Sequence, residues 1–541
     1  MFHFQRKLNM DCENLSDGPT VINTSCDDVE TDIDSVLRRL GSCGNSQRVL
    51  QLLCMIMHLS VSYQSFLMYY AANNPPWICV GNSSTFCEKN YGKIFDVTDD
   101  DFRKRCSLNR TEWRYTAAEP FSIVTELDLV CDKDSLAALI TAAFFIGWGV
   151  GGIFSGLLAD TYGRKVTQML SLFLLFIFSF TLSYTNAVWQ VILLRSLIGA
   201  VTGTCLNVVY VLLSEYSVPE KRALAGCILQ ACFPVGNLLL SVVAYYEREW
   251  RKLCMYTSFP MIFSFLLTFA LLKSPRWLYA SGKTSKAENV LRTMAKFNKC
   301  EPFEFVLQQS SCLKANNKYS YKDLLFSNCS LTLLVAAQFY GWFSCGLVYY
   351  GVSLESSDLG GDIYTNFMLT TLGDIPGNFI TIYTSNRYGR KKTVLSSFLL
   401  CSIVLGGIAA VPKAFAHGRI VKVVLSMFGK CFINVAFGGF YLWSFEIFPT
   451  VVRTQGMTLC QVAARIGSAT SPFIATMLGN IYAPLPFMVM CGVSLLAALS
   501  GVALPETNNM ATRETFEDFT AKDRTVRVDE DEEILVSDSL K

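Results

Sequence analysis

Two short charged turns carry the residues of this sequence that are best suited to forming ion pairs. They occupy residues 160–165 (DTYGRK) and 386–391 (NRYGRK), and the same 226 positions separate Gly163 from Gly389. Each turn lies between two long apolar runs. A charged turn repeated at this distance in an apolar chain indicates that two homologous membrane halves were joined, which is typical of transporters.

A second charged pattern is also repeated. A glutamate and an arginine stand seven positions apart, with a proline between them, in residues 215–222 and again in residues 446–453. Charge pairs at helix ends are strong when desolvated and break when water enters, so they could hold one state of two rocking halves. Ordinary anchoring of helix ends by charges is the alternative. The candidate gate residues are Asp160, Gly163, Arg164, Lys165, Glu215, Arg222, Arg390, Glu446 and Arg453.

Two ionisable residues, Asp374 and Arg465, fall inside long apolar runs. A charge at the centre of a membrane helix costs roughly 2.5–3.5 kcal/mol, so each should face a partner, water or substrate. Pro376 and Gly377 follow Asp374 and predict a broken helix whose freed backbone groups could help bind an ion. The alternative is a structural Asp374–Arg465 pair that joins two helices.

The apolar runs that must position these residues are twelve in number, because a span needs about 20 mostly apolar residues. Hydrophobic residues make up 51% of the 541 residues and charged residues only 17%, against about 25% in soluble proteins. We therefore predict an all-α membrane protein with two six-helix pseudo-repeats. The predicted spans are 48–72, 135–158, 166–184, 187–212, 223–246, 253–272, 330–350, 362–384, 393–411, 420–444, 454–478 and 484–504.

Several function classes find no support in the sequence. The net charge of +2 is too small to indicate nucleic-acid binding. No zinc spacing, dinucleotide fingerprint, Walker sequence or nucleophile elbow is present, so we predict neither an enzyme nor an ATP-driven pump, and no metal or cofactor. Residues 1–15 lack an apolar core, so we expect no cleavable signal peptide.

Basic residues set the expected orientation. The segment 273–326 carries ten basic and four acidic residues, and both repeated turns are basic. Placing them inside puts both termini in the cytoplasm, although residues 247–252 and 413–422 then face outward with several basic residues. The expected units are a cytoplasmic segment 1–47, a six-helix half 48–272 with an external loop 73–134, a linker 273–329, a second half 330–504 and an acidic tail 505–541.

The expected external loop carries four cysteines and two glycosylation sequons. Cys79, Cys87, Cys106 and Cys131 lie in it, with sequons at Asn82 and Asn109. An even cysteine count in an oxidising compartment predicts two disulfides with three possible connectivities. A set of free thiols is the alternative.

These motifs resemble the organic cation, carnitine and organic anion transporters (solute carrier family 22) of the major facilitator superfamily. Besides the turns, the resemblance rests on residues 274–278 (SPRWL), 446–453 (EIFPTVVR), 504–507 (LPET) and 129–132 (LVCD), and it covers roughly residues 40–510. Asn386 stands where the family has an acid, which could weaken one gate contact. Leu272 and Lys273 replace the usual Pro-Glu, and the loop has four cysteines where many relatives have six.

The resemblance implies small organic ions as substrates, moved by alternating access through a central cavity. It also implies an acid at the Arg465 position in cation carriers and arginine there in anion and carnitine carriers. Anion carriers often add a lysine at the position that Asn378 occupies here. A zwitterion such as carnitine fits best, with its carboxylate on Arg465 and its ammonium on aromatic faces and Asp374. The candidate substrate-binding residues are Arg465, Asp374, Tyr349, Tyr350, Tyr441, Trp443, Tyr210 and Gln64.

Alternatives remain for both the substrate and the aromatic residues. The expected substrate is an organic cation or a carnitine-like zwitterion, and an organic anion exchanger is the second reading. A membrane receptor that no longer transports is a third. The aromatic residues could instead pack the core or form an interfacial belt. The expected partners are a small organic ion and the lipid bilayer of the plasma membrane, without nucleic acid. Sodium or proton coupling and the oligomeric state stay open.

Overall fold

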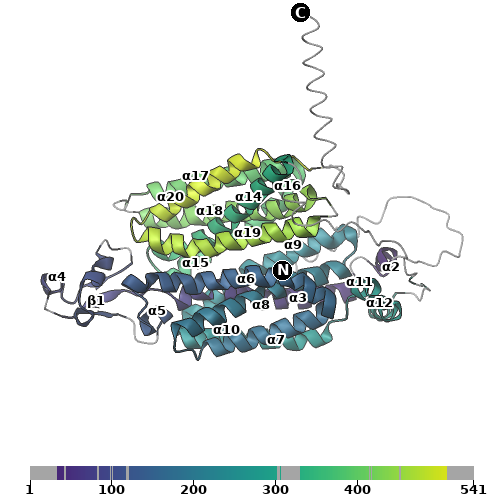
Figure 1. The fold of residues 1–541 in the computed structure, drawn as a ribbon, viewed down its shortest axis with the longest axis horizontal. Coiled ribbons are helices and arrows are strands. Elements are labelled where there is room, and N and C mark those ends of the chain that lie inside the picture. The colour runs from purple at the N-terminus through teal and green to yellow at the C-terminus, as the bar shows by residue number, and fades with distance from the viewer. Residues whose placement is uncertain are drawn as a thin grey trace, which may run out of the picture.

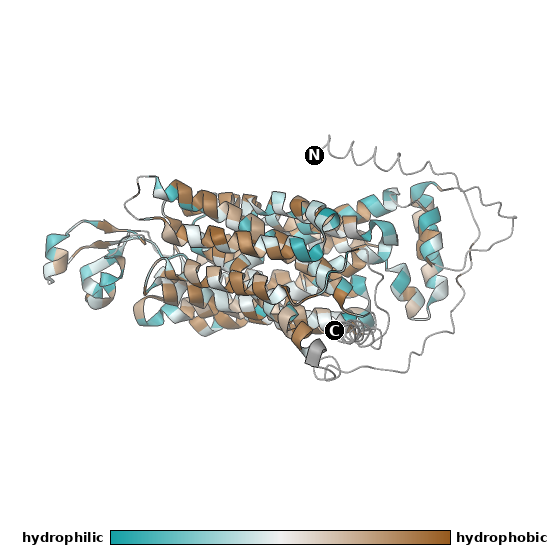
Figure 2. Ribbon diagram, turned by 90° about the horizontal axis from the view of Figure 1, so that it is seen from above, coloured by the Kyte–Doolittle hydropathy of each residue, from teal (hydrophilic) through white to brown (hydrophobic). Residues whose placement is uncertain are grey.

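The computed structural model describes residues 33–41, 44–81, 84–97, 99, 101–116, 121–300, 305, 307, 329–412, 415, 417–449 and 452–508. Two helical halves lie side by side along the long axis of the molecule (Figure 1). Apolar residues cover the middle of the bundle, and hydrophilic residues gather at its two ends (Figure 2). This distribution is the one that a bilayer around the middle requires.

The N-terminal half contains six long helices, each within a few residues of a predicted span. The longest of these helices, α6 and α8, have 29 residues each, which is enough to cross a bilayer with some tilt. The helices are α3 (Asn45–Ala71), α6 (Asp134–Tyr162), α7 (Arg164–Leu182), α8 (Val188–Tyr216), α9 (Pro219–Tyr246) and α10 (Trp250–Leu267).

The C-terminal half repeats this order, and the predicted twelve-span fold is confirmed. Its eighth span is interrupted at Gly373, directly before Asp374, where Pro376 cannot donate a helical hydrogen bond. Nine of the described helices are long and apolar enough to cross a membrane by themselves; the interrupted span, α19 and the 17-residue α20 are not among them. The helices are α14 (Cys329–Leu354), α15 (Ile363–Leu372), α16 (Asp374–Tyr388), α17 (Arg390–Ala410), α18 (Gly418–Ile447), α19 (Arg453–Phe473) and α20 (Leu485–Gly501).

Glycines let helices within each half approach closely. A Cβ added to Gly151 of α6 would lie 1.8 Å from the carbonyl oxygen of Ala200 in α8. In the second half, a Cβ added to Gly346 of α14 would lie 2.0 Å from the carbonyl oxygen of Ala464 in α19. Small residues at such crossings are typical of membrane helices, and the second crossing fixes the position of Arg465, the neighbour of Ala464.

A small domain between α3 and α6, here called the disulfide domain (residues 73–133), lies at one end of the bundle (Figure 1). A three-stranded antiparallel sheet, ordered β2 (Ile94–Phe95), β1 (Trp77–Cys79), β3 (Trp113–Tyr115), forms its core. Trp77 stacks on Phe95 with ring centroids 4.5 Å apart. The cysteines pair as Cys79–Cys87 and Cys106–Cys131, which selects one of the three connectivities.

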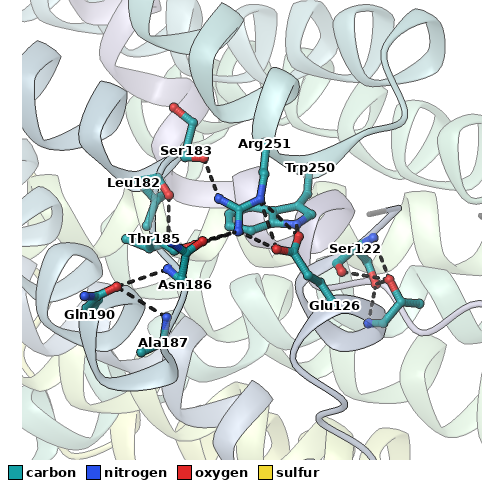
Figure 3. A network of polar contacts seen from close by, with 11 residues as sticks. Ser122, Glu126, Leu182, Ser183, Thr185, Asn186, Ala187, Gln190, Trp250 and Arg251 are labelled. Carbon is teal, nitrogen blue, oxygen red and sulfur yellow. Dashed lines mark hydrogen bonds and ion pairs between the residues drawn. The ribbon is translucent and has the colours of Figure 1, made fainter. Parts of the chain in front are cut away.

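A polar network fastens the disulfide domain to the N-terminal half (Figure 3). Glu126, in α5 (Ile123–Glu126), accepts hydrogen bonds from Trp250 at 2.7 Å and from Nε of Arg251 at 3.1 Å. Arg251 also donates to the carbonyl oxygens of Ser183 and Thr185, both at 2.7 Å. Burial alone would raise the pKa of Glu126, but the hydrogen bonds from Arg251 and Trp250 lower it overall. The domain is therefore seated on the ends of α7 and α10.

Three short helices cover the opposite end of the N-terminal half: α2 (Ile33–Arg39), α11 (Pro275–Ala280) and α12 (Thr284–Asn298). Val36 and Leu37 of α2 are fully buried. Asp34 of α2 forms ion pairs with Arg222, at 3.4 Å, and with Arg276. This end also carries both charged turns, so we call it the turn end and the other the domain end.

Candidate functional site

The two charged turns have the same backbone shape. Gly163 and Gly389 have φ values of +89° and +96°, a region that side chains with a Cβ rarely adopt. A Cβ on Gly163 would lie 3.0 Å from the ring of Trp277, and one on Gly389 would lie 2.5 Å from the carboxylate of Glu506. Trp277 and Glu506 belong to the SPRWL and LPET segments, so these segments close over the two turns.

The repeated glutamates pair with the arginines of the turns and not with the arginines of their own seven-residue repeats. Nε of Arg164 donates to Glu215 at 2.8 Å, and Nη2 of Arg390 donates to Glu446 at 2.9 Å. All four side chains are less than a fifth exposed. Both pairs lie inside one half, so each one joins neighbouring helices of that half.

The two arginines that end the repeats share a backbone contact but have different side-chain surroundings. In both, Nε donates to the carbonyl oxygen five positions earlier, at 3.3 Å for Arg222 and 3.1 Å for Arg453. Arg222 also reaches Asp34, as described above, whereas the guanidinium of Arg453 lies 4.5 Å from the ring centroid of Phe445, and its Nη2 is buried without a hydrogen-bond partner among the described residues. Hence the repeats match in sequence and in this backbone contact, and differ in the side chains around their arginines.

The lysines of the turns hold helix ends in both halves. Nζ of Lys165 donates to the carbonyl oxygens of Phe269 and Leu271, and Nζ of Lys391 donates to that of Val502 at 2.7 Å. These carbonyls lie just past the ends of the sixth and twelfth spans. The turns therefore connect the second and third spans of each half to its last one.

The second turn replaces its missing acid with groups from beyond α20. In the first turn, Asp160 pairs with Arg164 at 2.8 Å. In the second, Asn386 stands at that position and Arg390 instead donates to the side-chain oxygen of Asn508. Glu506 accepts the backbone N–H of Arg390 at 3.0 Å. The expected weakening at Asn386 is thus offset by the segment after the last span.

Asp374 faces a lysine that the sequence analysis overlooked. Tyr349 donates its hydroxyl to Asp374 at 2.9 Å. Nζ of Lys430, in α18, lies 3.0 Å from the ring centroid of the same tyrosine and donates to its carbonyl oxygen at 2.8 Å. Asp374 and Lys430 are both 1% exposed. The acid and the lysine therefore share Tyr349, and our inventory of one positive charge in this region is wrong.

Arg465 lies apart from any carboxylate in the part of the chain that the structure describes. Its guanidinium is 3.8 Å from the ring centroid of Trp148, on α6 of the other half, and its Nη1 donates to the hydroxyl of Tyr350 at 3.3 Å. It is 8% exposed. The alternative of a structural Asp374–Arg465 ion pair is not what forms, because Asp374 is held by Tyr349.

An aromatic layer lies between Arg465 and the domain end. Phe145 of α6 packs on Tyr350 of α14 with centroids 4.4 Å apart, and Phe66 of α3 packs on Tyr350 at 5.3 Å and on Phe367 of α15 at 5.2 Å. Both halves contribute to it. Beyond it, a cavity of about 1070 Å³ lies under the disulfide domain, lined by Thr141 one helical turn above Phe145. The layer therefore lies between this cavity and Arg465.

The other expected binding residues are placed unevenly. Tyr441 packs on Trp342 with centroids 4.5 Å apart, and Tyr210 is 44% exposed and lies beside Gly226 of α9. Trp443 is fully buried and its indole nitrogen donates to the carbonyl oxygen of Pro505 at 2.8 Å. Trp443 therefore packs the C-terminal half and does not join the Arg465 cluster.

Gln64 is engaged by a second charge that the sequence analysis did not weigh. Nη1 and Nη2 of Arg195, a fully buried residue of α8, donate to the side-chain and backbone oxygens of Gln64 at 3.3 and 3.1 Å. The arginine also lies 4.4 Å from the ring centroid of Phe144. Arg195 and Lys430 both sit inside predicted spans, so the test that found Asp374 and Arg465 would have found them. Trp148 gave no such signal.

The remaining expected sites concern the surface and metals. Asn109 is exposed on the disulfide domain, and Asn82 lies outside the described residues. Among residues that the structure places, no group of three His, Cys, Asp or Glu side chains is arranged to hold a metal ion.

Two six-span halves that repeat the same order of helices and the same charged turns define a transporter of the major facilitator type. A family model described as "Sugar (and other) transporter" matches residues 95–519. A solved structure, the inward open conformation of the xylose transporter XylE from E. coli, has a TM-score of 0.62 at 15% identity and covers 88% of this chain and 99% of its own. That likeness concerns the fold.

The chain belongs to solute carrier family 22. It is 30% identical over 500 residues to "Solute carrier family 22 member 15-like" of Xenopus tropicalis, covering 90% of this chain and 96% of that protein. It is 32% identical over 410 residues to "Organic cation transporter protein" of Drosophila melanogaster, covering 73% and 74%. "Organic anion transporter 3" of Oryctolagus cuniculus is 28% identical over 510 residues, covering 90% and 93%.

Proposed function

We propose that this protein carries small organic ions that bear a carboxylate, as plain anions or zwitterions, by alternating access. The observation that supports this is Arg465, a buried guanidinium without a carboxylate partner among the described residues. Burying a charge is costly unless it is paired, so a substrate carboxylate is a group that would complete this site. The planar fork of arginine suits bidentate carboxylate binding.

The buried charges of the C-terminal half bear on which of the substrate classes suggested by the sequence is favoured. Asp374 is balanced by Lys430 through Tyr349, which leaves Arg465 as the buried charge without a carboxylate partner among the described residues inside the C-terminal spans. A simple organic cation would therefore meet a net positive site. Relatives named for organic cations and for organic anions both occur, so the names of relatives alone do not choose between these substrates.

Trp148 and Tyr350 are expected to shape the site around this carboxylate. Trp148 holds the guanidinium plane by a cation–π contact, and the Tyr350 hydroxyl fixes one edge of it. Because Trp148 comes from α6 and Arg465 from α19, the site bridges the two halves. A ligand bound there would sense their relative motion, which alternating access needs.

The setting of this transport is also part of the proposal. We place the turn end in the cytoplasm, with both termini, and the disulfide domain outside a plasma membrane, because the turn end carries the basic linker. On this placement the aromatic layer lies between Arg465 and the outside. No catalytic step is part of this function.

Uptake by oocytes that express the chain tests the substrate class. Labelled carnitine, p-aminohippurate and tetraethylammonium would be supplied with and without Na⁺ to wild type, Arg465→Ala, Arg465→Lys and the exposed control Arg114→Ala. We expect uptake of a carboxylate-bearing substrate by wild type, reduced about 10- to 100-fold by Arg465→Ala, since a hydrogen bond to a charged group contributes about 1.5–3 kcal/mol.

The controls separate the site from expression. Arg465→Lys keeps the charge but loses the fork and should lie between wild type and Arg465→Ala, while Arg114→Ala should equal wild type at equal surface density. Wild-type uptake of tetraethylammonium alone, or full carboxylate uptake by Arg465→Ala, would overturn the proposal.

A further inference from the structure

We propose that Lys430 determines the charge selectivity of the site by keeping Asp374 compensated. Without Lys430, Asp374 would become an acceptor for a cationic substrate. This inference deepens the proposed function and rests on it. Lys430 does not need to touch the substrate, because it acts on Asp374 through Tyr349.

Lys430 is fixed by several contacts in the interior of the C-terminal half. Its ammonium donates to the carbonyl oxygen of Tyr349 at 2.8 Å and to the hydroxyl of Ser353 at 2.5 Å. It also lies 3.0 Å from the ring centroid of Tyr349 and 5.3 Å from that of Phe66. An ammonium held on two oxygens and an aromatic face has a defined position, so its charge is permanently directed at this region.

Tyr349 couples the lysine to the acid. Its hydroxyl donates to Oδ2 of Asp374 at 2.9 Å, while its ring and carbonyl contact Lys430. Because opposite charges in a poorly screened interior interact strongly, removing one leaves the other exposed to any mobile charge that enters.

Asp374 keeps one oxygen available for such a charge. Its Oδ1 is buried and has no hydrogen-bond partner among the residues that the structure describes, whereas its backbone oxygen already accepts a hydrogen bond from the side chain of Asn434 at 2.9 Å. An isolated buried carboxylate is costly, and an organic cation could supply the missing partner. In wild type, Lys430 opposes that cation by like-charge repulsion.

The charges predict how each variant should select. Wild type holds Asp374, Lys430 and Arg465, with one net positive charge. Lys430→Met leaves Asp374 against Arg465 and removes the repulsion of cations. The double variant Lys430→Met/Asp374→Asn restores one net positive charge, on Arg465 alone. If Lys430 only ties α18 to α14, the double variant gains nothing over Lys430→Met.

The experiment measures the ratio of tetraethylammonium to p-aminohippurate uptake, each normalised to surface protein. We expect Lys430→Met to raise this ratio at least tenfold and the double variant to return it to within about threefold of wild type. Lys430→Arg, which keeps the charge, and Lys286→Met, an exposed lysine of α12, should keep the wild-type ratio.

The outcomes separate this inference from the proposed function. If wild type takes up no carboxylate-bearing substrate, the proposed function itself is contradicted. If wild type takes up such a substrate and Lys430→Met leaves the uptake ratio unchanged, only the role of Lys430 is contradicted. A changed ratio in Lys430→Arg would also overturn it, and this variant stays informative if Lys430→Met fails to reach the surface.

Discussion

The two halves share their charges at the turn end but not inside the membrane. At the turn end, Arg164–Glu215 and Arg390–Glu446 are equivalent pairs. Inside the spans, the N-terminal half holds Arg195 against a neutral amide. The C-terminal half instead holds an acid, a lysine and an arginine on α16, α18 and α19.

This difference separates two kinds of work. Residues that occur in both halves bind helix ends together, which a molecule with two rocking halves needs twice. Residues that occur in one half only are free to define a ligand site. We therefore expect changes to the shared charges to affect all substrates alike, and changes to the unshared charges to affect the choice among them.

The largest expected effect comes from breaking the shared pairs. Arg164→Ala leaves Glu215 nearly buried without its ion-pair partner, and Arg390→Ala leaves Glu446 with the Thr507 hydroxyl but without its ion-pair partner. Losing one member of a buried pair costs about 3–5 kcal/mol, so uptake of every substrate should fall about tenfold or more in both variants. Uptake per surface transporter, with its substrate ratio, measures this. Loss of uptake in only one of the two variants, or a changed ratio between substrates, would contradict the same role for these pairs in both halves.

The turn glycines should show a smaller and unequal effect on stability. The two glycines combine positive φ with ψ values of 150° and 163°, where alanine costs about 1–3 kcal/mol, and at Gly389 it must also displace the Glu506 carboxylate that holds the turn. Gly389→Ala should therefore lower the melting temperature of the purified protein more than Gly163→Ala. Gly156→Ala is the control, since a Cβ there meets no atom within 4 Å. Equal stability of all three would contradict this prediction.

Asp34 tests a contact that only the N-terminal half has. Burial favours its neutral form, but the hydrogen bond from Arg276 and the charges of Arg276 and Arg222 lower its pKa below the usual 3.8. A lowered pKa stabilises the folded state above pH 3.8, and the gain is lost as the pH falls through the lower value. Asp34→Asn should cost about 1–2 kcal/mol at pH 7.

The check is thermal unfolding of wild type and Asp34→Asn over a pH series. The gap between the two should be constant near neutral pH and close below about pH 3.8. A gap that persists at low pH would show that the asparagine disturbs packing and would leave the ion pairs without a measurable part in stability.

The smallest expected effect on transport concerns the surface. Asn109 is exposed on the disulfide domain, so Asn109→Gln and Thr111→Ala should each remove one glycan, visible as a faster band on a gel, with uptake unchanged. An unchanged band in both variants would contradict the proposed outward placement of this domain.

The sequence predicted the fold better than the contacts within it. Hydropathy located the spans, and Pro376 predicted the interruption beside Asp374, because both signals are local. The partners of the charges were not local: Glu215 binds an arginine 51 positions earlier, and Lys430 binds a carbonyl 81 positions earlier. Lys430 was itself readable as a charge within a predicted span. That it neutralises Asp374 was not, because this depends on how α14, α16 and α18 pack.

The segment just after α20 sets a limit on how this protein can be shortened. The carbonyl oxygen of Pro505 accepts a hydrogen bond from the indole nitrogen of Trp443, and Glu506 accepts one from the backbone of the second turn. Thr507 donates its hydroxyl to Glu446 at 2.6 Å, and the side-chain oxygen of Asn508 accepts a hydrogen bond from Arg390. A stop codon after Leu504 would delete four anchors at once, while one after Asn508 would keep them all. Truncations, affinity tags and reporter fusions at this end should therefore begin beyond Asn508.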